Sequence, residues 1–269
     1  MLLTGLAVAG VTAYLGVAGF LYFKQRDMVF PAWAVAPPDP GFHAGIEGLE
    51  RVTLETPDGE RLLAYWRRPE PGKPTLLTFH GNGSTPQPHA ERFAGDAVWR
   101  ESGVGLLAPA YRGYPGSSGS PSEEGLIIDG LAALDFLRAE LGAGHPVVLH
   151  GHSLGSAIAI AVAAQRPVEA LYLESPFTSA LAIAKRQYPF LPGFLMRDPF
   201  HSDRRIGTVS AGQIFIVHGT DDRVIRVEMA RDLAALADSP QLYIVEGGDH
   251  VSIMGLYDRE IAESLGLLK

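Results

Sequence analysis

The chain contains no cysteine among its 269 residues. This absence excludes disulfides, thiolate catalysis and cysteine metal sites, and it is typical of proteins kept in a reducing compartment. Positive charge is also scarce, because 22 lysines and arginines face 30 aspartates and glutamates, which gives a formal net charge of −8. A protein that binds nucleic acid needs a basic face to neutralise phosphates, so we expect no nucleic-acid partner.

Motifs for metals and cofactors are missing as well. The nine histidines are scattered without the H-E-x-x-H spacing of a zinc site, and the chain has neither a P-loop nor a dinucleotide fingerprint. We therefore expect no metal and no organic cofactor. There is no internal repeat or low-complexity tract, and nothing in the sequence predicts the oligomeric state.

The start of the chain lacks charge. Residues 2–23 contain no charged side chain, and as a helix they would extend about 33 Å, enough to cross a bilayer core of about 30 Å. Lys24 and Arg26 follow this stretch instead of preceding it, which favours an uncleaved anchor over a secretory signal. The same two cations favour a cytoplasmic location for the rest of the chain. We predict a membrane anchor over residues 1–26 and a linker over residues 27–48.

Beyond residue 48, short apolar runs alternate with longer helical stretches. Residues 49–66 suit an antiparallel hairpin, and the later runs suit buried parallel strands (75–79, 104–108, 147–149, 171–173, 214–217 and 242–245). Such alternation predicts one α/β domain over residues 49–269, with a mainly parallel sheet and helices on both faces. Prolines and aromatics interrupt the pattern in residues 175–212. That segment is either a surface connection or a small lid that shapes a substrate pocket.

A nucleophile motif occupies residues 151–155, which read Gly-His-Ser-Leu-Gly. The motif lies between a short strand-like run and an unbroken apolar stretch that suits a buried helix. A strand, a tight turn and a helix with serine at the apex form a nucleophile elbow, in which the glycines permit the sharp turn. We therefore expect Ser153 to be the catalytic nucleophile.

The other members of a catalytic triad follow two later strands. A serine hydroxyl needs an imidazole to remove its proton and a carboxylate to orient that imidazole, and after this elbow the order is serine, acid, histidine. His250 is the predicted base. The acid is Asp222 or its neighbour Asp221; we favour Asp222 and expect Asp221 to cap a turn or the helix near residue 227. Asp249 is expected to form hydrogen bonds within its own loop.

Acyl transfer also needs N–H donors for the oxyanion that develops in the transition state. One donor is expected from the backbone of Leu154, directly after the nucleophile. The other is expected from the loop His80-Gly81-Asn82-Gly83, which follows the strand at residues 75–79. Our candidate in that loop is the backbone N–H of Asn82.

Several motifs occur together and in order. They are Lys24–Pro31 after the apolar stretch, H-G-N-G at 80–83, Y-R-G-Y-P-G-S-S-G-S-P-S-E at 111–123, the elbow, E-S-P-F-T-S at 174–179, the Asp222 loop and His250. In this combination the chain resembles the Bem46-like branch of the α/β-hydrolase superfamily, which includes the α/β-hydrolase domain-containing 13 and 17 proteins. The resemblance spans nearly the whole chain. It implies an α/β-hydrolase fold with a mostly parallel eight-stranded sheet after one transmembrane helix, with Asp222 as the acid and Asn82 as an oxyanion donor.

Together these patterns predict a membrane-anchored serine hydrolase of the carboxylesterase, lipase or acyl-thioesterase type. Its Ser153-His250-Asp222 triad would cleave carboxylic ester or thioester bonds through an acyl-enzyme. The anchor favours a lipid or another small acyl ester as substrate. A serine peptidase with the same triad and a non-catalytic membrane scaffold are the alternatives. The sequence leaves two roles for Arg112: it either binds a substrate anion or ties loops together.

Overall fold

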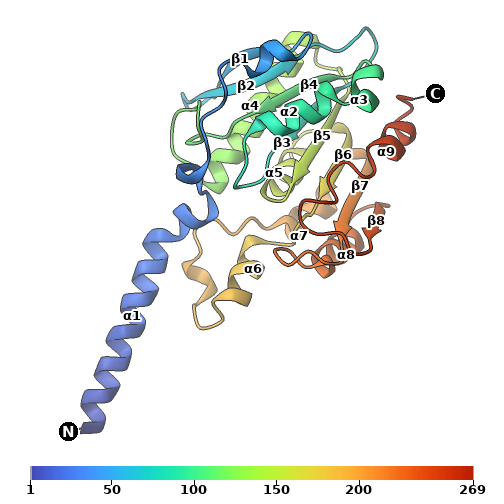
Figure 1. Ribbon diagram of the computed structural model, residues 1–269. Helices are drawn as coiled ribbons and strands as arrows, with labels where there is room; N and C mark the ends of the chain where they lie inside the picture. The colour runs from blue at the N-terminus through green and yellow to red at the C-terminus, as the bar shows by residue number, and fades with distance from the viewer. Residues whose placement is uncertain (1, 269) are drawn as a thin grey trace.

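The protein is built around one eight-stranded sheet, described for residues 2–268 in a computed structural model (Figure 1). The strand order is β1-β2-β4-β3-β5-β6-β7-β8. β2 pairs antiparallel with both β1 and β4, and all other pairs are parallel. The strands are β1 (Glu50–Glu55), β2 (Arg61–Arg67), β3 (Thr75–Phe79), β4 (Gly105–Pro109), β5 (Val147–His152), β6 (Val168–Glu174), β7 (Ala211–Gly219) and β8 (Gln241–Val245). This topology confirms the predicted α/β-hydrolase fold.

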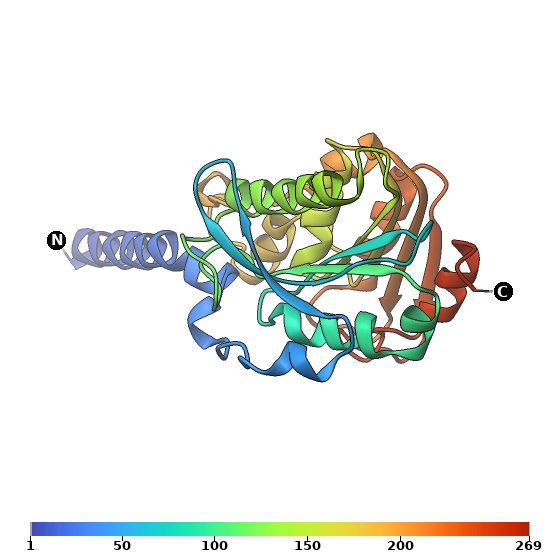
Figure 2. The same ribbon diagram turned by 90° about the horizontal axis from the view of Figure 1, so that it is seen from above.

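Helices cover both faces of the sheet (Figure 2). One face carries α4 (Glu123–Leu141), α5 (Leu154–Ala163), α7 (Ser202–Arg205) and α8 (Val227–Leu236). The other carries α2 (Pro86–Gly95), α3 (Ala97–Glu101) and α9 (Asp258–Ser264). All ten residues of α5 are buried, which explains why its sequence has no polar face.

Alternation of side chains along the strands builds a separate core on each face. On β6, Leu171 and Leu173 belong to the core under α4 and α5, whereas Ala170 and Tyr172 belong to the core under α2 and α9. The parallel strands β3 and β5 to β8 end at one edge of the sheet, and loops that follow them meet there. That edge carries the candidate site residues.

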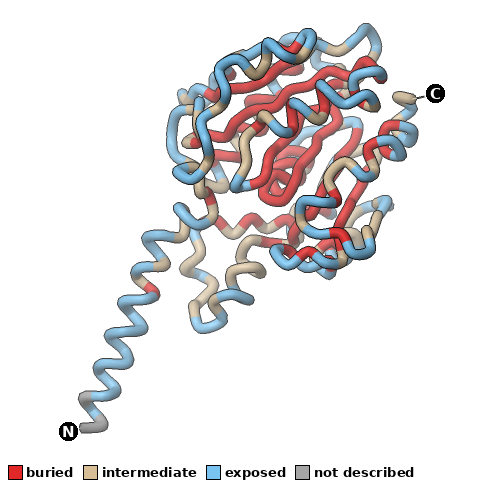
Figure 3. Tube along the Cα trace, viewed as in Figure 1, coloured by how far each residue is buried: buried red, intermediate tan, exposed pale blue. Residues whose placement is uncertain are grey.

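The first helix, α1 (Leu2–Val29), projects away from the sheet, and most of its length is exposed (Figures 1 and 3). Its stretch Leu6–Val29 is long and apolar enough to cross a membrane. Two short 3-10 helices, η1 (Ala32–Ala34) and η2 (Phe42–Gly45), lead from α1 to β1. The apolar N-terminal helix thus fits the transmembrane helix that the sequence predicts.

The chain between β6 and β7 has two parts. The first contains α6 (Ala180–Gln187) and η3 (Gly193–Leu195), and it lies beside α1 (Figure 1). We refer to residues 180–195 as the α6–η3 segment. The second part contains α7 and η4 (Ile206–Thr208) and packs against α5 and α8. The first part, together with the residues just after it, therefore reaches out toward the N-terminal helix.

Candidate active site

Ser153 occupies a sharp turn between β5 and α5. Its backbone has φ 53° and ψ −117°, a left-handed conformation that costs energy for any residue with a side chain. The flanking glycines have no room for a side chain. A Cβ on Gly151 would lie 2.3 Å from the carbonyl oxygen of Gly155, and a Cβ on Gly155 would lie 2.0 Å from that of Phe79. The G-x-S-x-G pattern is thus a packing requirement of this turn.

The structure brings Ser153, His250 and Asp222 together from three loops. Ser153 Oγ lies 3.0 Å from His250 Nε2, and His250 Nδ1 lies 2.7 Å from Asp222 Oδ2. These distances are in the normal hydrogen-bond range. With Nδ1 protonated and facing the carboxylate, Nε2 is the atom that accepts the serine proton. The arrangement matches a serine nucleophile, a base and an orienting acid.

Asp222 is held in place by more than His250. Its Oδ1 accepts hydrogen bonds from the backbone N–H groups of Val224 and Ile225, at 2.9 and 2.8 Å, and His218 Nε2 lies 3.2 Å from Oδ2. Burial opposes the charged form, but the bonds from His218, His250 and the Ile225 N–H outweigh it and hold the pKa of Asp222 well below its usual range. The carboxylate is therefore ionised at neutral pH.

The two neighbouring acids face elsewhere. Asp221 is exposed, and α8 starts after Arg226 without a side-chain cap, so the expected capping of that helix by Asp221 is wrong. Asp249 accepts hydrogen bonds from the backbone N–H groups of Val251 and Ser252, at 2.9 and 2.8 Å, which is the local role expected for it. Of the three aspartates, only Asp222 contacts the His250 imidazole.

The two expected oxyanion donors line the same cavity as Ser153 and His250. Leu154 is the first residue of α5, where backbone N–H groups have no partner within the helix. Asn82 lies in the loop after β3, and its carbonyl accepts a 2.8 Å hydrogen bond from the Tyr114 hydroxyl. The Tyr111 hydroxyl binds the carbonyl of His80 in the same way, at 2.7 Å. Two buried tyrosines thus hold the Asn82 loop beside the elbow.

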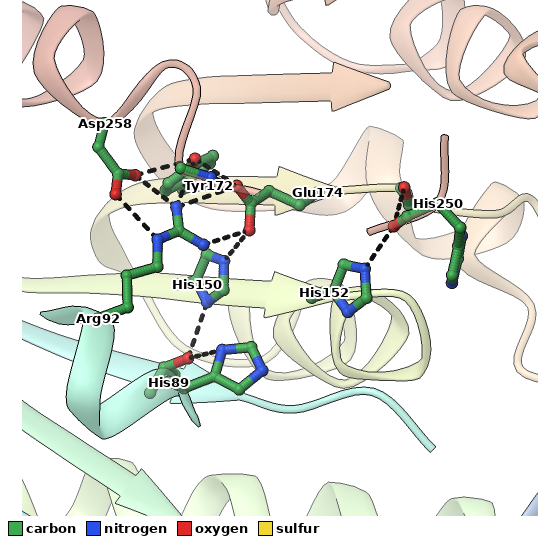
Figure 4. Close-up of polar contacts among 11 residues, drawn as sticks. His89, Arg92, His150, His152, Tyr172, Glu174, His250 and Asp258 are labelled. Atoms are coloured by element: carbon green, nitrogen blue, oxygen red, sulfur yellow. Dashed lines mark hydrogen bonds and ion pairs between the residues drawn. The ribbon is translucent and has the colours of Figure 1, made fainter. Parts of the chain in front are cut away.

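A further histidine, His152, links the elbow to His250. His152 Nε2 lies 3.0 Å from the backbone carbonyl oxygen of His250 (Figure 4). Burial lowers the pKa of His152 to about 4, so the ring is neutral at pH 7 and Nε2–H donates to that carbonyl. The sequence placed His152 in the elbow but predicted no contact with His250. The only feature of the sequence that could have indicated this contact is the position of His152 directly before Ser153.

Behind the elbow lies a buried ionic cluster (Figure 4). Arg92 from α2 donates to both carboxylate oxygens of Glu174, at 2.7 and 3.0 Å, and also to Asp258 of α9. Glu174 in addition accepts from the Tyr172 hydroxyl at 2.6 Å and lies 2.9 Å from His150 Nε2. Burial disfavours the charge on Glu174, but Arg92 and His150 outweigh it and keep its pKa well below the usual range.

This cluster reaches the elbow through the main chain. The backbone N–H of Ser153 donates to the carbonyl oxygen of Glu174 at 2.9 Å. No local pattern in the sequence joins this cluster, because Arg92, Glu174 and Asp258 lie 82 and 84 residues apart. A glutamate at the end of a buried strand was the one visible signal.

Arg112 ties loops together. It is buried, and it donates to Asp129 at 2.8 Å and to both carboxylate oxygens of Asp58, at 2.6 and 3.0 Å. Its guanidinium is fully paired with carboxylates of the protein. Of the two roles expected for Arg112, the structure therefore supports tying loops together over binding a substrate anion. Among residues 2–268, no group of three or more metal-ligating side chains comes together.

Known proteins resemble this chain along most of its length. A sequence model described as the alpha/beta hydrolase family matches residues 76–212. An uncharacterised protein of Mycobacterium tuberculosis is 34% identical over 238 residues, which are 87% of this chain and 82% of that protein. Protein bem46 of Schizosaccharomyces pombe is 29% identical and covers 82% of this chain and 77% of its own length. The lysophosphatidylserine lipase ABHD12 of Gallus gallus is 32% identical, but the match spans 61% of this chain and 47% of that protein.

A solved structure shares the fold. The Pyrococcus furiosus esterase Pf2001 aligns with a TM-score of 0.65 at 18% sequence identity, over 86% of this chain and 95% of the esterase. The family match, the relatives and the sheet topology agree with one another. The chain belongs to the alpha/beta hydrolase family and is a Bem46-like member of it.

Proposed function

We propose that the protein is a membrane-anchored serine hydrolase that cleaves carboxylic ester or thioester bonds. One observation carries the proposal: the hydroxyl of Ser153, the imidazole of His250 and the carboxylate of Asp222 lie in a hydrogen-bonded line of 3.0 and 2.7 Å. The names of an esterase and a lipase among the similar proteins support an ester as substrate. The proposed division of the chain is an anchor at 1–26, a linker at 27–48 and a hydrolase domain at 49–269.

The first half-reaction forms an acyl-enzyme. His250 Nε2 takes the hydroxyl proton as Ser153 Oγ bonds to the substrate carbonyl carbon. The backbone N–H groups of Leu154 and Asn82 stabilise the negative oxygen of the tetrahedral intermediate, each worth about 3 kcal/mol in comparable enzymes. The intermediate then collapses, the bond to the alcohol or thiol breaks, and His250 gives its proton to that leaving group.

Water completes the reaction. It attacks the acyl carbon while His250 takes one of its protons, and the bond to Ser153 Oγ then breaks as that oxygen recovers the proton. The carboxylic acid leaves and the enzyme returns to its starting state. Asp222 stays ionised throughout, and its charge stabilises the imidazolium that forms twice in each cycle.

The proposed orientation puts the hydrolase domain on the cytoplasmic side, because Lys24 and Arg26 flank the end of the apolar span nearest to it. Protease added to intact cells should leave the domain uncut and should digest it after lysis. Digestion in intact cells would reverse the orientation without touching the proposed chemistry.

Labelling with a fluorophosphonate tests the nucleophile. The purified full-length protein should react with the probe and hydrolyse p-nitrophenyl butyrate, and Ser153→Ala should lose both properties. Ser210→Ala, a matched change at an exposed serine, should retain both. Peptide amides cleaved faster than esters would indicate a peptidase, and a wild-type protein that does not react with the probe would indicate a non-catalytic scaffold.

A further inference from the structure

A single cavity connects Ser153 to the N-terminal helix. Its volume is about 480 Å³, within the range of about 300–1,000 Å³ found for small-molecule pockets. Ser153, Leu154, Asn82 and His250 lie at one end. Among the described residues, Lys185 is the only lysine, arginine, aspartate or glutamate that lines it. The rest of the lining is mainly apolar, so the space favours a hydrocarbon chain over a polar group.

The anchor helix supplies one side of this cavity. Its lining residues recur at the spacing of one helical face: Ala18, Leu21, Tyr22, Gln25, Met28 and Val29. The other face is exposed, with Val17, Phe20 and Phe23 showing 47%, 63% and 78% of their surface. Helix α1 therefore has one face toward the cavity and one face toward its surroundings.

Polar contacts fasten α1 to the α6–η3 segment and the residues just after it. Gln25 donates to the carbonyl of Leu195 at 3.1 Å and accepts from the N–H of Arg197 at 2.8 Å. Arg26 donates to both carboxylate oxygens of the buried Asp198, at 2.8 and 3.2 Å. These contacts hold the two sides of the cavity together at the end nearest the sheet.

A third contact lies far along the helix. The Tyr14 hydroxyl donates to the carbonyl oxygen of Phe190 at 3.1 Å. Tyr14 precedes Val29 by 15 residues, or about 22 Å along the helix axis, and it lies inside the stretch that is apolar enough to cross a membrane. If α1 spans a bilayer, the tip of the α6–η3 segment lies below the surface of that bilayer, next to the helix.

The composition of this tip suits a lipid environment. Residues 188–195 read Tyr-Pro-Phe-Leu-Pro-Gly-Phe-Leu and carry no charge, and Phe190 and Phe194 expose 53% and 85% of their surface. Large exposed aromatics and leucines cost free energy in water and gain it in the interfacial region of a membrane. The Tyr14 bond to Phe190 also satisfies a backbone carbonyl that hydrocarbon could not.

We propose that α1 and the α6–η3 segment form an acyl-chain site that is open to the bilayer, and that a membrane lipid enters it sideways to place its ester at Ser153. The fatty acyl chain lies along the face of α1 that runs from Val29 to Ala18, a distance of about 16 Å. The anchor helix is thus part of the substrate site as well as a tether. This inference rests on the proposed function, because it identifies the substrate class of the same site.

Blocking the cavity from the anchor side tests the inference. Ala18 lines the cavity with 9% of its surface exposed, whereas Ala13, on the same helix, is exposed and outside it. In full-length protein reconstituted in vesicles, Ala18→Trp should lower the ratio of kcat/KM for p-nitrophenyl palmitate to that for the butyrate at least tenfold. The matched Ala13→Trp should leave the ratio unchanged. An unchanged ratio in Ala18→Trp would overturn the acyl-chain site.

Photo-crosslinking of the wild-type protein gives a second, independent answer. A long-chain alkyl fluorophosphonate with a diazirine at the end of its chain should bind Ser153 and, on illumination, crosslink to residues 18–28 or to the α6–η3 segment. Crosslinks confined to other parts of the chain would overturn the inference while leaving the proposed function intact. Failure of the probe to react with the enzyme, or persistent labelling of Ser153→Ala, would instead contradict the proposed function.

Discussion

Two differently built regions meet at Ser153. On the side of the sheet, the reacting groups are fixed by buried polar contacts: the Arg92–Glu174–Asp258 cluster, the His152 bond to His250 and the four groups around Asp222. On the side of the N-terminal helix, α1 and the α6–η3 segment enclose an apolar cavity with few polar contacts between them. We call these the polar region and the apolar region.

The two regions differ in the free energy that is lost when one of their contacts is broken. Removing one partner of a buried charge leaves the other charge unpaired in a low-dielectric interior, at a cost of about 3–5 kcal/mol. An apolar, half-exposed contact costs far less to break and can re-form in another arrangement. We therefore expect changes in the polar region to affect rate and stability, and changes in the apolar region to affect the choice of substrate.

The largest effect is expected at Asp222, the proposed acid of the triad. Asp222→Asn should lower kcat by about 10⁴-fold, because an amide no longer fixes the protonated Nδ1 of His250 or stabilises the imidazolium. Asp221→Asn, the same change one residue away at an exposed site, should leave kcat within about twofold. Hydrolysis of p-nitrophenyl butyrate measures both, and equal losses in the two variants would remove Asp222 from the triad.

The next effect concerns stability. Arg92→Met leaves Glu174 and Asp258 buried without their cation and should lower the free energy of unfolding by about 3–5 kcal/mol. The matched Arg68→Met breaks an exposed pair with Glu140 and a contact with the Trp66 ring at 6.0 Å from its centroid, and its cost should be about 1 kcal/mol. Thermal unfolding in detergent compares the variants. A small loss for Arg92→Met would mean that the buried ion pairs do not fix the polar region.

A dependence on pH should follow from the buried histidines. Burial lowers the pKa of His80 and of His152 to about 4, from an ordinary value of 6.5. As the pH falls from 6.5 toward 4, these two histidines become protonated in the unfolded chain but stay neutral in the folded chain. The free energy of unfolding therefore falls. The loss is at most about 1.4 kcal/mol per pH unit for each histidine.

The melting temperature in detergent between pH 7 and pH 5 checks this expectation. The decrease should be smaller in His152→Gln, which removes one of the titrating groups but keeps an N–H donor for the His250 carbonyl. Above pH 7 the two proteins should respond to pH alike. A variant that keeps the full wild-type slope would show that His152 does not contribute.

The smallest effect on stability is expected in the apolar region. Arg26→Met removes the pair with the buried Asp198 and should cost about 2 kcal/mol. This is less than the cost of Arg92→Met, because Arg26 is itself one-third exposed and Asp198 keeps a 2.9 Å hydrogen bond from the backbone N–H of Glu123. Its main result should be a several-fold lower preference for palmitate over butyrate, because the two sides of the cavity are less firmly joined. Lys24→Met breaks an exposed pair with Asp27 and should change neither property. A loss of butyrate hydrolysis equal to that of palmitate would contradict the division between the two regions.

The sequence predicted the polar region's reacting groups better than their surroundings. The position of Ser153 was recognisable in the sequence because its turn has no room for side chains at positions 151 and 155. Both positions must therefore be glycine, and this requirement produces a short local motif. Asp222 and His250 were found because each follows a recognisable apolar run. The run before Asp222 is the buried end of β7, whereas the run before His250 is β8, an edge strand with no buried residue, so the expectation of a buried strand at 242–245 is wrong. Other contacts depend on side chains that meet only after folding, so no spacing along the chain indicates them. They are the contact of His218 with Asp222, the cluster around Arg92 and the bond from His152.

The apolar region was predicted only as a tether and a possible lid. An apolar helix has the same composition whether it faces lipid or protein, and α1 does both. The sequence predicted no role for Gln25, and it predicted that Arg26 is a flanking charge that sets the orientation of the helix. In the structure both side chains form hydrogen bonds with residues 195–198. The apolar character of residues 188–195 was visible, but the place of this tip beside Tyr14 was not.

The tight fit of Gly155 against the carbonyl of Phe79 has a consequence for protein engineering. Because α5 touches β3 there without a gap, side chains cannot be added to the turn to reshape the pocket. Ala18, Leu21 and Met28, by contrast, lie on a helix with one open face and can be exchanged singly. A library aimed at new acyl preferences should therefore diversify the N-terminal helix and leave the turn untouched.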